Sequence, residues 1–386
     1  MTYTRRQLEP VLLTAARAFP AVVLTGPRRA GKTYLLRRLF PSAQYVLMED
    51  PDVVARVRAD PQGFLDGLHT PAILDEVQNV PEIFAFVRSR IDRRHKRGQW
   101  ILTGSQEAPL MQNVSESMAG RAAIVQLLPF SHREHSKVGP LSGGFPEALQ
   151  NRRGAALWFS SYIQTYLERD VRQVLAVRDL ATFRRFLALL ASRHGQVVNK
   201  TDLAAPLGVS VPTIAQWLGV LETTLQIALV PPFFENLGKR LIKSPKLYFL
   251  DSGLVCHLLG IASEAELRRS PFQGAVFEGF VASEILKSQL HRGSRRELYY
   301  FRDQQGLEVD FIVPRKNGAV ELVEVKANRT VKPQMADPMR KLSAAFPSGR
   351  RVQMTLIHEA PRDIQATAAL TQGVRAVPWQ TWASEQ

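Results

Sequence analysis

Apolar residues in the first third of the chain follow helical and strand periods in turn, and this alternation predicts a parallel sheet covered by helices. Residues 5–19 repeat apolar side chains at helical spacing. Short apolar runs of strand length follow, separated by helical stretches, at residues 21–25, 45–48, 72–76, 100–106 and 122–128. Strands that alternate with helices form an open parallel sheet with helices on both faces. We therefore expect an α/β domain of this type at the start of the chain.

The middle of the chain is mainly helical, and its last third mixes strands with helices. Residues 155–192 are predicted to be helical. The later segments predict a helix–turn–helix at 202–221, a strand at 228–234, a strand passing into a helix at 246–254, a helix at 272–290, strands at 307–313 and 320–326, a helix at 335–346, and strands at 351–357 and 374–382. We predict three domains, with boundaries at 1–140, 141–240 and 241–386.

The strands at 307–313 and 320–326 flank Asn317-Gly318, which is typical of a hairpin turn. A two-residue loop would pair polar with apolar side chains along the whole ladder. A three-residue loop with Gly318 in the left-handed conformation matches polarity instead. The expected register pairs Arg315 with Ala319, Ile312 with Leu322, Phe311 with Val323, Asp310 with Glu324, and Val309 with Val325.

The composition is that of a globular protein with two or three domains. The chain has 386 residues, of which 45% are hydrophobic and 22% charged. No apolar run approaches the roughly 18 to 20 residues of a membrane span, and the first residues lack a signal peptide. The single cysteine, Cys256, excludes an internal disulfide and a multi-cysteine zinc site. These features predict a cytoplasmic protein with no membrane partner.

The chain is strongly basic, with a formal net charge of +15 and a pI of about 10.2. Because the basic residues are spread along the chain, they would favour a polyanion such as nucleic acid or an acidic protein partner. Solubility and an arginine-rich genome would produce the same composition. Charge alone therefore leaves the partner open.

The segment after the first strand has the spacing of a phosphate loop. It reads Gly26-Pro27-Arg28-Arg29-Ala30-Gly31-Lys32-Thr33-Tyr34, that is, G-x-x-x-x-G-K-T between a strand and a helix. Glycine lets the backbone N–H groups curl around phosphate, and the helix N-terminus adds a partial positive charge. Lys32 would reach the β and γ phosphates, and the Thr33 hydroxyl would bind Mg²⁺. We predict an ATP site with Mg²⁺, formed by residues 26–34.

The third predicted strand ends in Asp75-Glu76, which would complete an ATPase site. Asp75 would hold the magnesium shell and contact the bound nucleotide, and Glu76 would polarise the attacking water. As an isolated pair these acids would mean little. Downstream of a phosphate loop they predict hydrolysis as well as binding.

Two further positions are candidates for catalysis in this domain. Ser105 or Thr103, at the end of the fourth strand, could sense the γ phosphate, although strand-end turn chemistry explains them equally well. Arg121 precedes the fifth strand and could act as an arginine finger. It could also be an ordinary surface residue.

The predicted helix–turn–helix and the strand after it form a winged-helix candidate. Ser210 would cap its second helix, with Pro212 in the first turn. The stretch 212–219 carries no lysine or arginine, which counts against base reading. Basic residues after the strand could touch phosphates instead, namely Lys239, Arg240, Lys243 and Lys246. A packing or protein-contact role is an equal alternative.

The expected hairpin register brings two acids together. Asp310 and Glu324 would lie about 5 Å apart at their Cβ atoms and would repel each other unless a cation lay between them. A divalent metal ion and the nearby Lys326 would supply that positive charge. A solvated amphipathic hairpin explains the same residues without any chemistry.

Several motifs together resemble a prokaryotic family of AAA+-type ATPases whose C-terminal domain has a restriction-endonuclease-like fold. The resemblance covers nearly the whole chain. The motifs are the phosphate loop, Leu74-Asp75-Glu76-Val77-Gln78, Leu102-Thr103-Gly104-Ser105, Ala119-Gly120-Arg121 and Gly143-Gly144-Phe145-Pro146.

The C-terminal acids resemble the PD-(D/E)xK nuclease core. The resemblance implies that Glu278, Asp310 and Glu324 bind Mg²⁺ and that Lys326 orients the water or stabilises the phosphate. Val309 stands where that signature usually has proline. The implied fold class is α/β: a P-loop NTPase parallel-sheet domain, a helical or winged-helix middle domain, and a PD-(D/E)xK-like C-terminal domain.

Three functional hypotheses follow. The first is a Mg²⁺-dependent ATPase coupled to a nuclease-like module that engages DNA. The second is a nucleotide-controlled switch that binds nucleic acid or protein without cleavage, and the third is an interaction platform without a DNA role. A homo-oligomer is required if Arg121 acts on a neighbouring copy.

Overall fold

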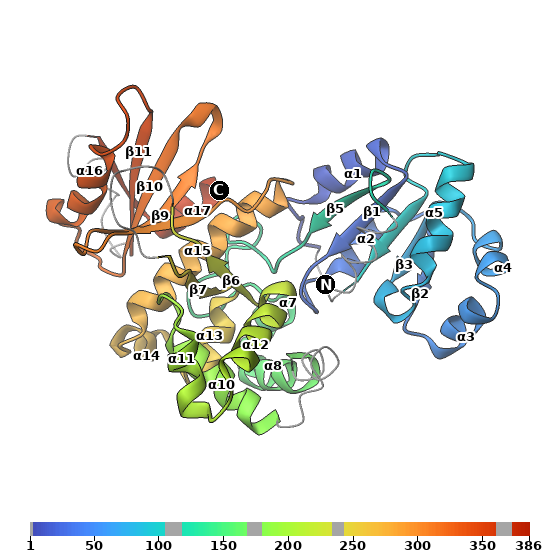
Figure 1. Cartoon of the computed structure of the whole chain (residues 1–386), viewed down its shortest axis with the longest axis horizontal. Coiled ribbons are helices and arrows are strands. Elements are labelled where there is room, and N and C mark those ends of the chain that lie inside the picture. The colour runs from blue at the N-terminus through green and yellow to red at the C-terminus, as the bar shows by residue number, and fades with distance from the viewer. Residues whose placement is uncertain (1–2, 105–117, 168–179, 234–242, 360–372) are drawn as a thin grey trace. The chain divides into compact units, whose positions relative to one another are not determined.

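The computed structural model shows the chain as two compact units (Figure 1). The first unit contains residues 1–130, 219–226 and 289–295, and the second contains residues 131–218, 227–288 and 296–386. The structure describes residues 3–104, 118–167, 180–233, 243–359 and 373–386. The predicted three-domain division stays a prediction.

The first unit is built on a five-stranded parallel sheet with the strand order β2–β3–β4–β1–β5. Its strands are β1 (Ala21–Thr25), β2 (Gln44–Leu47), β3 (Ala72–Asp75), β4 (Trp100–Thr103) and β5 (Ala122–Gln126). Its helices are α1 (Glu9–Ala18), α2 (Lys32–Leu39), α3 (Pro51–Ala59), α4 (Pro61–Asp66) and α5 (Ile83–Arg93). The predicted parallel sheet is confirmed.

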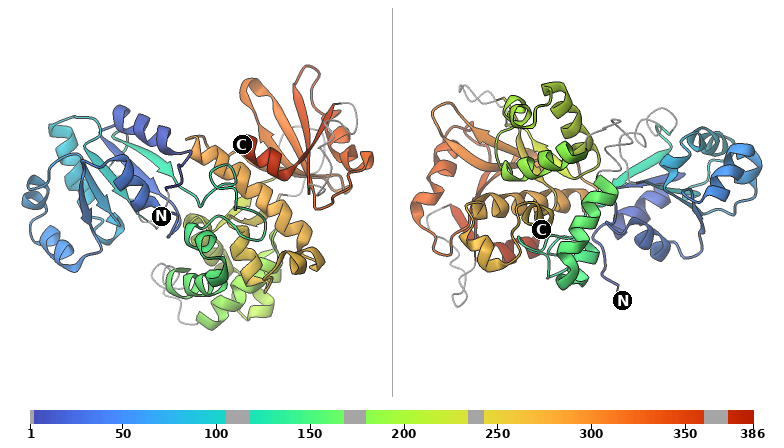
Figure 2. Two further views of the ribbon diagram at one scale, coloured as in Figure 1. Left: turned by 180° about the vertical axis from the view of Figure 1, so that it is seen from behind. Right: turned by 90° about the horizontal axis from the view of Figure 1, so that it is seen from below.

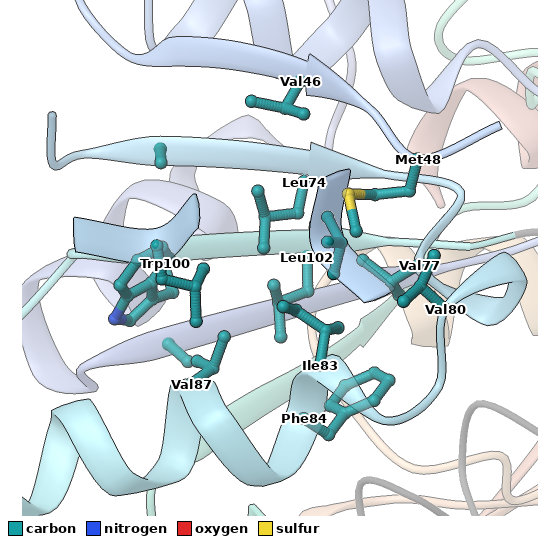
Figure 3. Packing of buried hydrophobic residues seen from close by; sticks show 14 of the residues in the cluster. Val46, Met48, Leu74, Val77, Val80, Ile83, Phe84, Val87, Trp100 and Leu102 are labelled. Atoms are coloured by element: carbon teal, nitrogen blue, oxygen red, sulfur yellow. The ribbon is translucent and has the colours of Figure 1, made fainter. Parts of the chain in front are cut away.

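Alternating strand residues bury two separate cores in this unit. Val22 and Leu24 of β1 pack in a cluster with α1 and α2, whereas Val23 packs in a cluster with α3, α4 and α5. Figure 3 shows part of the second cluster, where Leu74 and Leu102 lie over the α5 side chains. Because neighbouring residues of a strand point to opposite faces, helices cover both sides of the sheet. The predicted two-sided winding is confirmed.

The second unit combines helices with two sheets (Figure 2). Its helices are α7 (Pro146–Gln150), α8 (Ala155–Tyr162), α10 (Leu180–Ser192), α11 (Lys200–Ala204), most of α12 (Val211–Thr223), α13 (Ser252–Leu258), α14 (Glu264–Arg269), most of α15 (Gln273–His291), α16 (Asp337–Ser343) and α17 (Trp379–Glu385), with a π-helical turn at Ile163–Leu167. Its strands are β6 (Ile227–Val230), β7 (Lys246–Phe249), β8 (Tyr299–Arg302), β9 (Glu308–Pro314), β10 (Val320–Lys326), β11 (Val352–His358) and β12 (Val374–Pro378).

Helices α11 and α12 flank a turn and confirm the predicted helix–turn–helix. The Ser210 hydroxyl caps α12 by accepting a hydrogen bond of 3.2 Å from Thr213 N. Trp217 packs its ring against Phe183 and Phe186 of α10, with centroids 5.4 and 5.0 Å away. β6 and β7 pair antiparallel after these helices. The winged-helix assignment stays a prediction.

None of the described helices is by itself long and apolar enough to cross a membrane. The bent pair Lys200–Leu207 and Val211–Thr223, which meet at 110°, satisfies the requirement by length and composition only.

The larger sheet of the second unit is mixed, with the strand order β12–β11–β10–β9–β8. β8, β9 and β10 pair antiparallel, and β10, β11 and β12 pair parallel. Leu342 and Met339 of α16 pack on one face of this sheet in a cluster with Leu322.

The predicted hairpin register is confirmed from the turn as far as Phe311 and Val323. Ile312 pairs with Leu322 and Phe311 with Val323. The Arg315 N–H donates a hydrogen bond of 2.8 Å to the Ala319 carbonyl oxygen. Asn317 and Gly318 both adopt positive φ, at 59° and 73°, so two residues carry the turn where only Gly318 was expected to.

One strand prediction in this region was wrong, and one strand was missed. The predicted strand at 374–382 ends at Pro378, and Trp379 begins α17. Trp379, Trp382 and Ala383 have helical spacing, which the run of apolar residues concealed. The strand β8 was not predicted at all, because its four residues are too few to show a period.

Candidate functional site

The phosphate loop lies at the carboxyl end of β1 and needs glycine at its first position. Gly26 has a φ of 151°, and a Cβ atom there would lie 2.1 Å from the backbone oxygen of Leu127. That carbonyl follows β5, the strand beside β1. Gly31 has a φ of 95°, and Arg29 one of 62°. The loop therefore bends sharply between the strand and α2, as the motif predicted.

Lys32 begins α2 and turns back over the loop. Its ammonium group donates hydrogen bonds to the carbonyl oxygens of Gly26 and Pro27, at 2.9 and 3.0 Å, and the side chain is buried. The ammonium is therefore held at the centre of the loop that would surround a phosphate chain. Tyr34, two residues further along α2, is 56% exposed.

Thr33 and Asp75 meet although 42 residues separate them. The Thr33 hydroxyl donates a hydrogen bond of 2.6 Å to Asp75 Oδ2, which also accepts one of 2.9 Å from the Tyr45 hydroxyl. Burial raises the pKa of Asp75 above its ordinary value, while the hydrogen bond from Thr33 lowers it. A hydroxyl and a buried carboxylate beside a phosphate loop are the oxygen donors that Mg²⁺ prefers.

Glu76 occupies a left-handed conformation at the end of β3, with a φ of 57°. Its carboxylate accepts a hydrogen bond from Gln78 Nε2 and lies 3.9 Å from the Arg28 guanidinium. Positive φ is costly for a residue with a side chain, and such strain concentrates at functional sites. The structure thus brings Arg28 of the loop and Glu76 together, as expected for two parts of one site.

A second candidate site lies in the second unit, where β9 and β10 separate. Asp310 and Glu324 follow the last paired positions of this ladder, and both are buried. Asp310 Oδ2 accepts a hydrogen bond of 2.8 Å from the backbone N–H of Val325. Both acids lie one residue beyond the last paired positions, and their predicted pairing with each other stays a prediction.

These acids line a cavity of about 820 Å³ together with Lys326, Asp303, Asp337 and Lys341. Lys326 Nζ lies 2.5 Å from Glu324 Oε1. The other carboxylate oxygen of Glu324, Oε2, is buried and has no hydrogen-bond partner among the described residues. A buried oxygen without a partner is costly, and a bound cation would satisfy it.

Glu278, the third predicted metal ligand, accepts hydrogen bonds from two other side chains. Its Oε1 accepts hydrogen bonds from Lys246 Nζ at 3.1 Å and from the Tyr248 hydroxyl at 2.5 Å. Within the described part of the chain, no group of three or more His, Cys, Asp or Glu side chains is arranged to hold one metal ion. The predicted set of three carboxylate ligands is therefore not assembled in the structure.

Lys246 is a member of this site that the sequence analysis misplaced. We expected it to contact phosphates at the surface, but its side chain is only 4% exposed and its ammonium lies 2.6 Å from Glu308 Oε1. The prediction was wrong for Lys246 because β7 carries it into the interior. Of the other three basic residues, Lys239 and Arg240 lie outside the described residues.

Burial raises the pKa values of two acids of this site. It raises the pKa of Glu324 to about 8, and the negative charge of Asp310 adds to the effect. Burial likewise raises the pKa of Glu278 to about 7, again with a contribution from Asp310. The two lysines therefore do not supply enough positive charge to keep these acids at their ordinary pKa values.

Comparison with known proteins identifies the first domain. Family models match an AAA domain at residues 18–136 and two domains of unknown function, DUF8612 at 140–265 and DUF4143 at 273–381. The uncharacterised proteins Rv2008c of Mycobacterium tuberculosis and Mb2031c of Mycobacterium bovis are each 35% identical to this chain over 347 residues, which are 88% of this chain and 77% of each relative. The chain belongs to this family of AAA-domain proteins.

Among solved structures, one match is a Walker-type ATPase of Pyrococcus abyssi. It is 16% identical, with a TM-score of 0.46, and the match covers 67% of this chain and 96% of that one.

The AAA domain places Thr103 between the two halves of the nucleotide site. Thr103 ends β4 and pairs with Leu24 of β1 on one side and Asp75 of β3 on the other. It is fully buried, and its hydroxyl has no hydrogen-bond partner in the described structure. Ser105, the other candidate sensor, lies outside the described residues.

Arg121 is not brought to the phosphate loop of its own AAA domain. Its carbonyl oxygen accepts a hydrogen bond from Ala21 N, which places it at the start of β1, about 15 Å along the strand from the loop. Its guanidinium pairs with Asp92 of α5, at 2.6 and 3.1 Å. A finger role in the same subunit is therefore excluded.

Arg6 is a residue of the AAA-domain site that the sequence analysis missed. Its guanidinium donates hydrogen bonds to the carbonyl oxygens of Ala30, at 3.1 Å, and Leu128, at 2.6 Å. It also lies 4.5 Å from the centre of the Phe130 ring. Arg6 thus ties the phosphate loop to the end of β5. Nothing in its sequence context signals this contact, because the partners are 24 and 122 residues away.

Gly26→Ala is expected to destabilise the AAA domain and weaken nucleotide binding. The new methyl group would lie 2.1 Å from a backbone oxygen, so the loop or β5 must shift, at a cost of roughly 1–3 kcal/mol of unfolding free energy. Thermal unfolding with and without ATP measures both effects. Gly120→Ala is the matched control, because Gly120 also has positive φ but has open space around its Cβ position. Equal stability and ATP response in the two variants would contradict the close contact.

Proposed function

We propose that this protein binds and hydrolyses ATP with Mg²⁺ and that its C-terminal domain is a PD-(D/E)xK-type, metal-dependent nuclease module acting on DNA. The observation that carries the first half is the contact between Thr33 and Asp75 beside the phosphate loop, at 2.6 Å. The second half is supported by Asp310, Glu324 and Lys326 around one cavity.

Each residue of the AAA-domain site has a separate role in ATP hydrolysis. Lys32 binds the β and γ phosphates, together with the backbone N–H groups of the loop. Thr33 and Asp75 would hold the magnesium ion, which would neutralise charge on the phosphates. Glu76 leaves its contacts with Arg28 and Gln78 and accepts a proton from the attacking water. Arg28, which lies 3.9 Å from Glu76 in this structure, would then pair with phosphate oxygens.

Lys32→Ala is expected to weaken ATP binding by a factor of about 10 to 100, because it removes a charge-assisted hydrogen bond to phosphate. Isothermal titration calorimetry with ATP and Mg²⁺ measures the loss. Lys96→Ala is the control, since Lys96 is an exposed lysine of the same unit. Unchanged affinity in the Lys32 variant would refute the assignment of the phosphate loop.

The C-terminal residues suit hydrolysis of a phosphodiester. Asp310 and Glu324 would hold the metal ion, and the unpartnered Glu324 Oε2 fits a cation ligand. Lys326 would stabilise the negative charge that develops on the phosphate, from a position 32% exposed to solvent at the cavity. The helix α15 and the mixed sheet are the elements that the nuclease resemblance implies.

The formal net charge of +15 supports DNA as the partner. The test incubates labelled linear duplex and single-stranded DNA with the full chain and Mg²⁺ or Mn²⁺, with and without ATP. Metal-dependent cleavage is the expected result. Absence of cleavage combined with DNA-stimulated ATP turnover would replace the nuclease by the nucleotide-controlled switch.

An oligomer is part of the proposal, because Arg121 can serve as a finger only for another copy. It would have to leave Asp92, with which it pairs at the protein surface.

A further inference from the structure

Four acids at or near the C-terminal cavity, Glu278, Glu308, Asp310 and Glu324, divide into two pairs with different partners. Glu278 and Glu308 share one cation, because Lys246 Nζ lies 3.1 Å from Glu278 Oε1 and 2.6 Å from Glu308 Oε1. Glu308 Oε2 also lies 3.5 Å from Arg302. Both acids of this first pair therefore already have a positive partner.

The second pair, Asp310 and Glu324, has no lysine that bridges its two carboxylates. Burial raises the pKa of Asp310, although the charges of Lys326 and Lys246 both act to lower it. Asp310 accepts a hydrogen bond from Val325 N and is in no ion pair among the described residues. Glu324 pairs with Lys326 through Oε1, while its buried Oε2 has no partner in the described structure. Of these four acids, only Glu324 has a buried carboxylate oxygen without a hydrogen-bond partner in the described structure.

The cavity divides these residues differently. Asp310, Glu324 and Lys326 line it together with Glu308, whereas Glu278 and Lys246 do not. Glu278 is turned instead towards Tyr248, which is fully buried beneath it. Lys246 is anchored in turn by β7, whose pairing with β6 fixes the direction of its side chain.

We propose that Lys246 is a built-in cation that withdraws Glu278 and Glu308 from metal binding, so that the site takes a single divalent ion between Asp310 and Glu324. This inference rests on the proposed metal-dependent function of the same cavity. Two carboxylates with water in the remaining positions suit Mg²⁺ or Mn²⁺. Lys246 is therefore a positioning residue. It lies in a different family-model region from the proposed metal ligands, in the middle model rather than the last one.

The test counts bound Mn²⁺ by the electron paramagnetic resonance of the free ion, with the full chain and no nucleotide. All proteins carry Asp75→Asn, which removes the metal ligand at the phosphate loop. We expect one Mn²⁺ per chain in this parent. Asp310→Asn and Glu324→Gln should weaken its binding by about tenfold or more, and Glu278→Gln by less than about threefold.

Lys246→Met keeps the length of the side chain but removes its charge. We expect this variant to bind a second Mn²⁺ through the released Glu278 and Glu308, while Lys332→Met, at an exposed position, keeps one. Circular dichroism shows which variants fold. If Lys246→Met does not fold, the effect of Glu278→Gln on Mn²⁺ binding decides whether Glu278 is withdrawn from the metal.

The outcomes separate the inference from the function on which it rests. If the parent binds no Mn²⁺, the metal-dependent function itself fails. If the parent binds two ions, if Glu278→Gln weakens binding as much as Asp310→Asn, or if folded Lys246→Met still binds one ion, only the role of Lys246 is overturned.

Discussion

Glu76→Gln is expected to slow ATP hydrolysis by a factor of about 10² to 10⁴ and to leave ATP binding in place. The amide has almost the same shape as the carboxylate and can still contact Gln78. It cannot accept the proton of the attacking water, so the chemical step loses its base. Release of phosphate measures turnover, and calorimetry measures binding in the same variant.

Glu82→Gln is the matched control for this prediction. Glu82 lies near Glu76 in the sequence and pairs with Arg58, but its side chain is 41% exposed at the surface. A Glu76 variant that hydrolyses ATP at close to the parent rate would remove Glu76 from catalysis. The proposal for the phosphate loop would then still stand, because Lys32→Ala tests that part separately.

Lys326→Met is expected to lower metal-dependent DNA cleavage by a factor of about 10² or more. The ammonium group would lie beside the phosphate where negative charge develops, and methionine keeps the length of the side chain without the charge. Gel analysis of labelled DNA with Mn²⁺ measures the loss. Mn²⁺ binding should persist, because Lys326 is not among the proposed ligands.

Lys316→Met provides the control for Lys326. Lys316 lies on the same hairpin but in its exposed turn. If both variants cleave DNA like the parent, the C-terminal cavity is not a nuclease site. If the parent does not cleave DNA at all, DNA-stimulated ATP turnover would favour the alternative of a nucleotide-controlled switch.

These experiments also address the coupling of the two sites. Hydrolysis-deficient Glu76→Gln still binds ATP, so it shows whether ATP binding by itself changes cleavage. Lys32→Ala shows the effect of an empty nucleotide site. A cleavage rate that is the same in both variants and in the parent would indicate two independent activities on one chain.

The sequence alone determined two features of this protein, the phosphate loop and the C-terminal hairpin. In both, the reactive residues lie in short segments whose local conformation follows from the sequence pattern. The phosphate loop is predictable because residues 26–33 are contiguous, and a strand before and a helix after them leave few conformations for the glycines. The hairpin of Asp310 and Glu324 is predictable for a similar reason. A strand has a period of two, so only one loop length matches polar with polar side chains, and the structure has that register.

The tertiary structure alone decided which distant residues complete each site. Arg6 reaches Ala30, Tyr45 reaches Asp75, and Lys246 reaches Glu308 across long separations in the chain. Such contacts depend on how helices and strands pack, and packing leaves no periodic signal in the sequence. The same packing places Arg121 beside Asp92, far from its own phosphate loop, and places Glu278 beside Lys246. The sequence thus identified the reactive groups, whereas the fold determined which of them share a site.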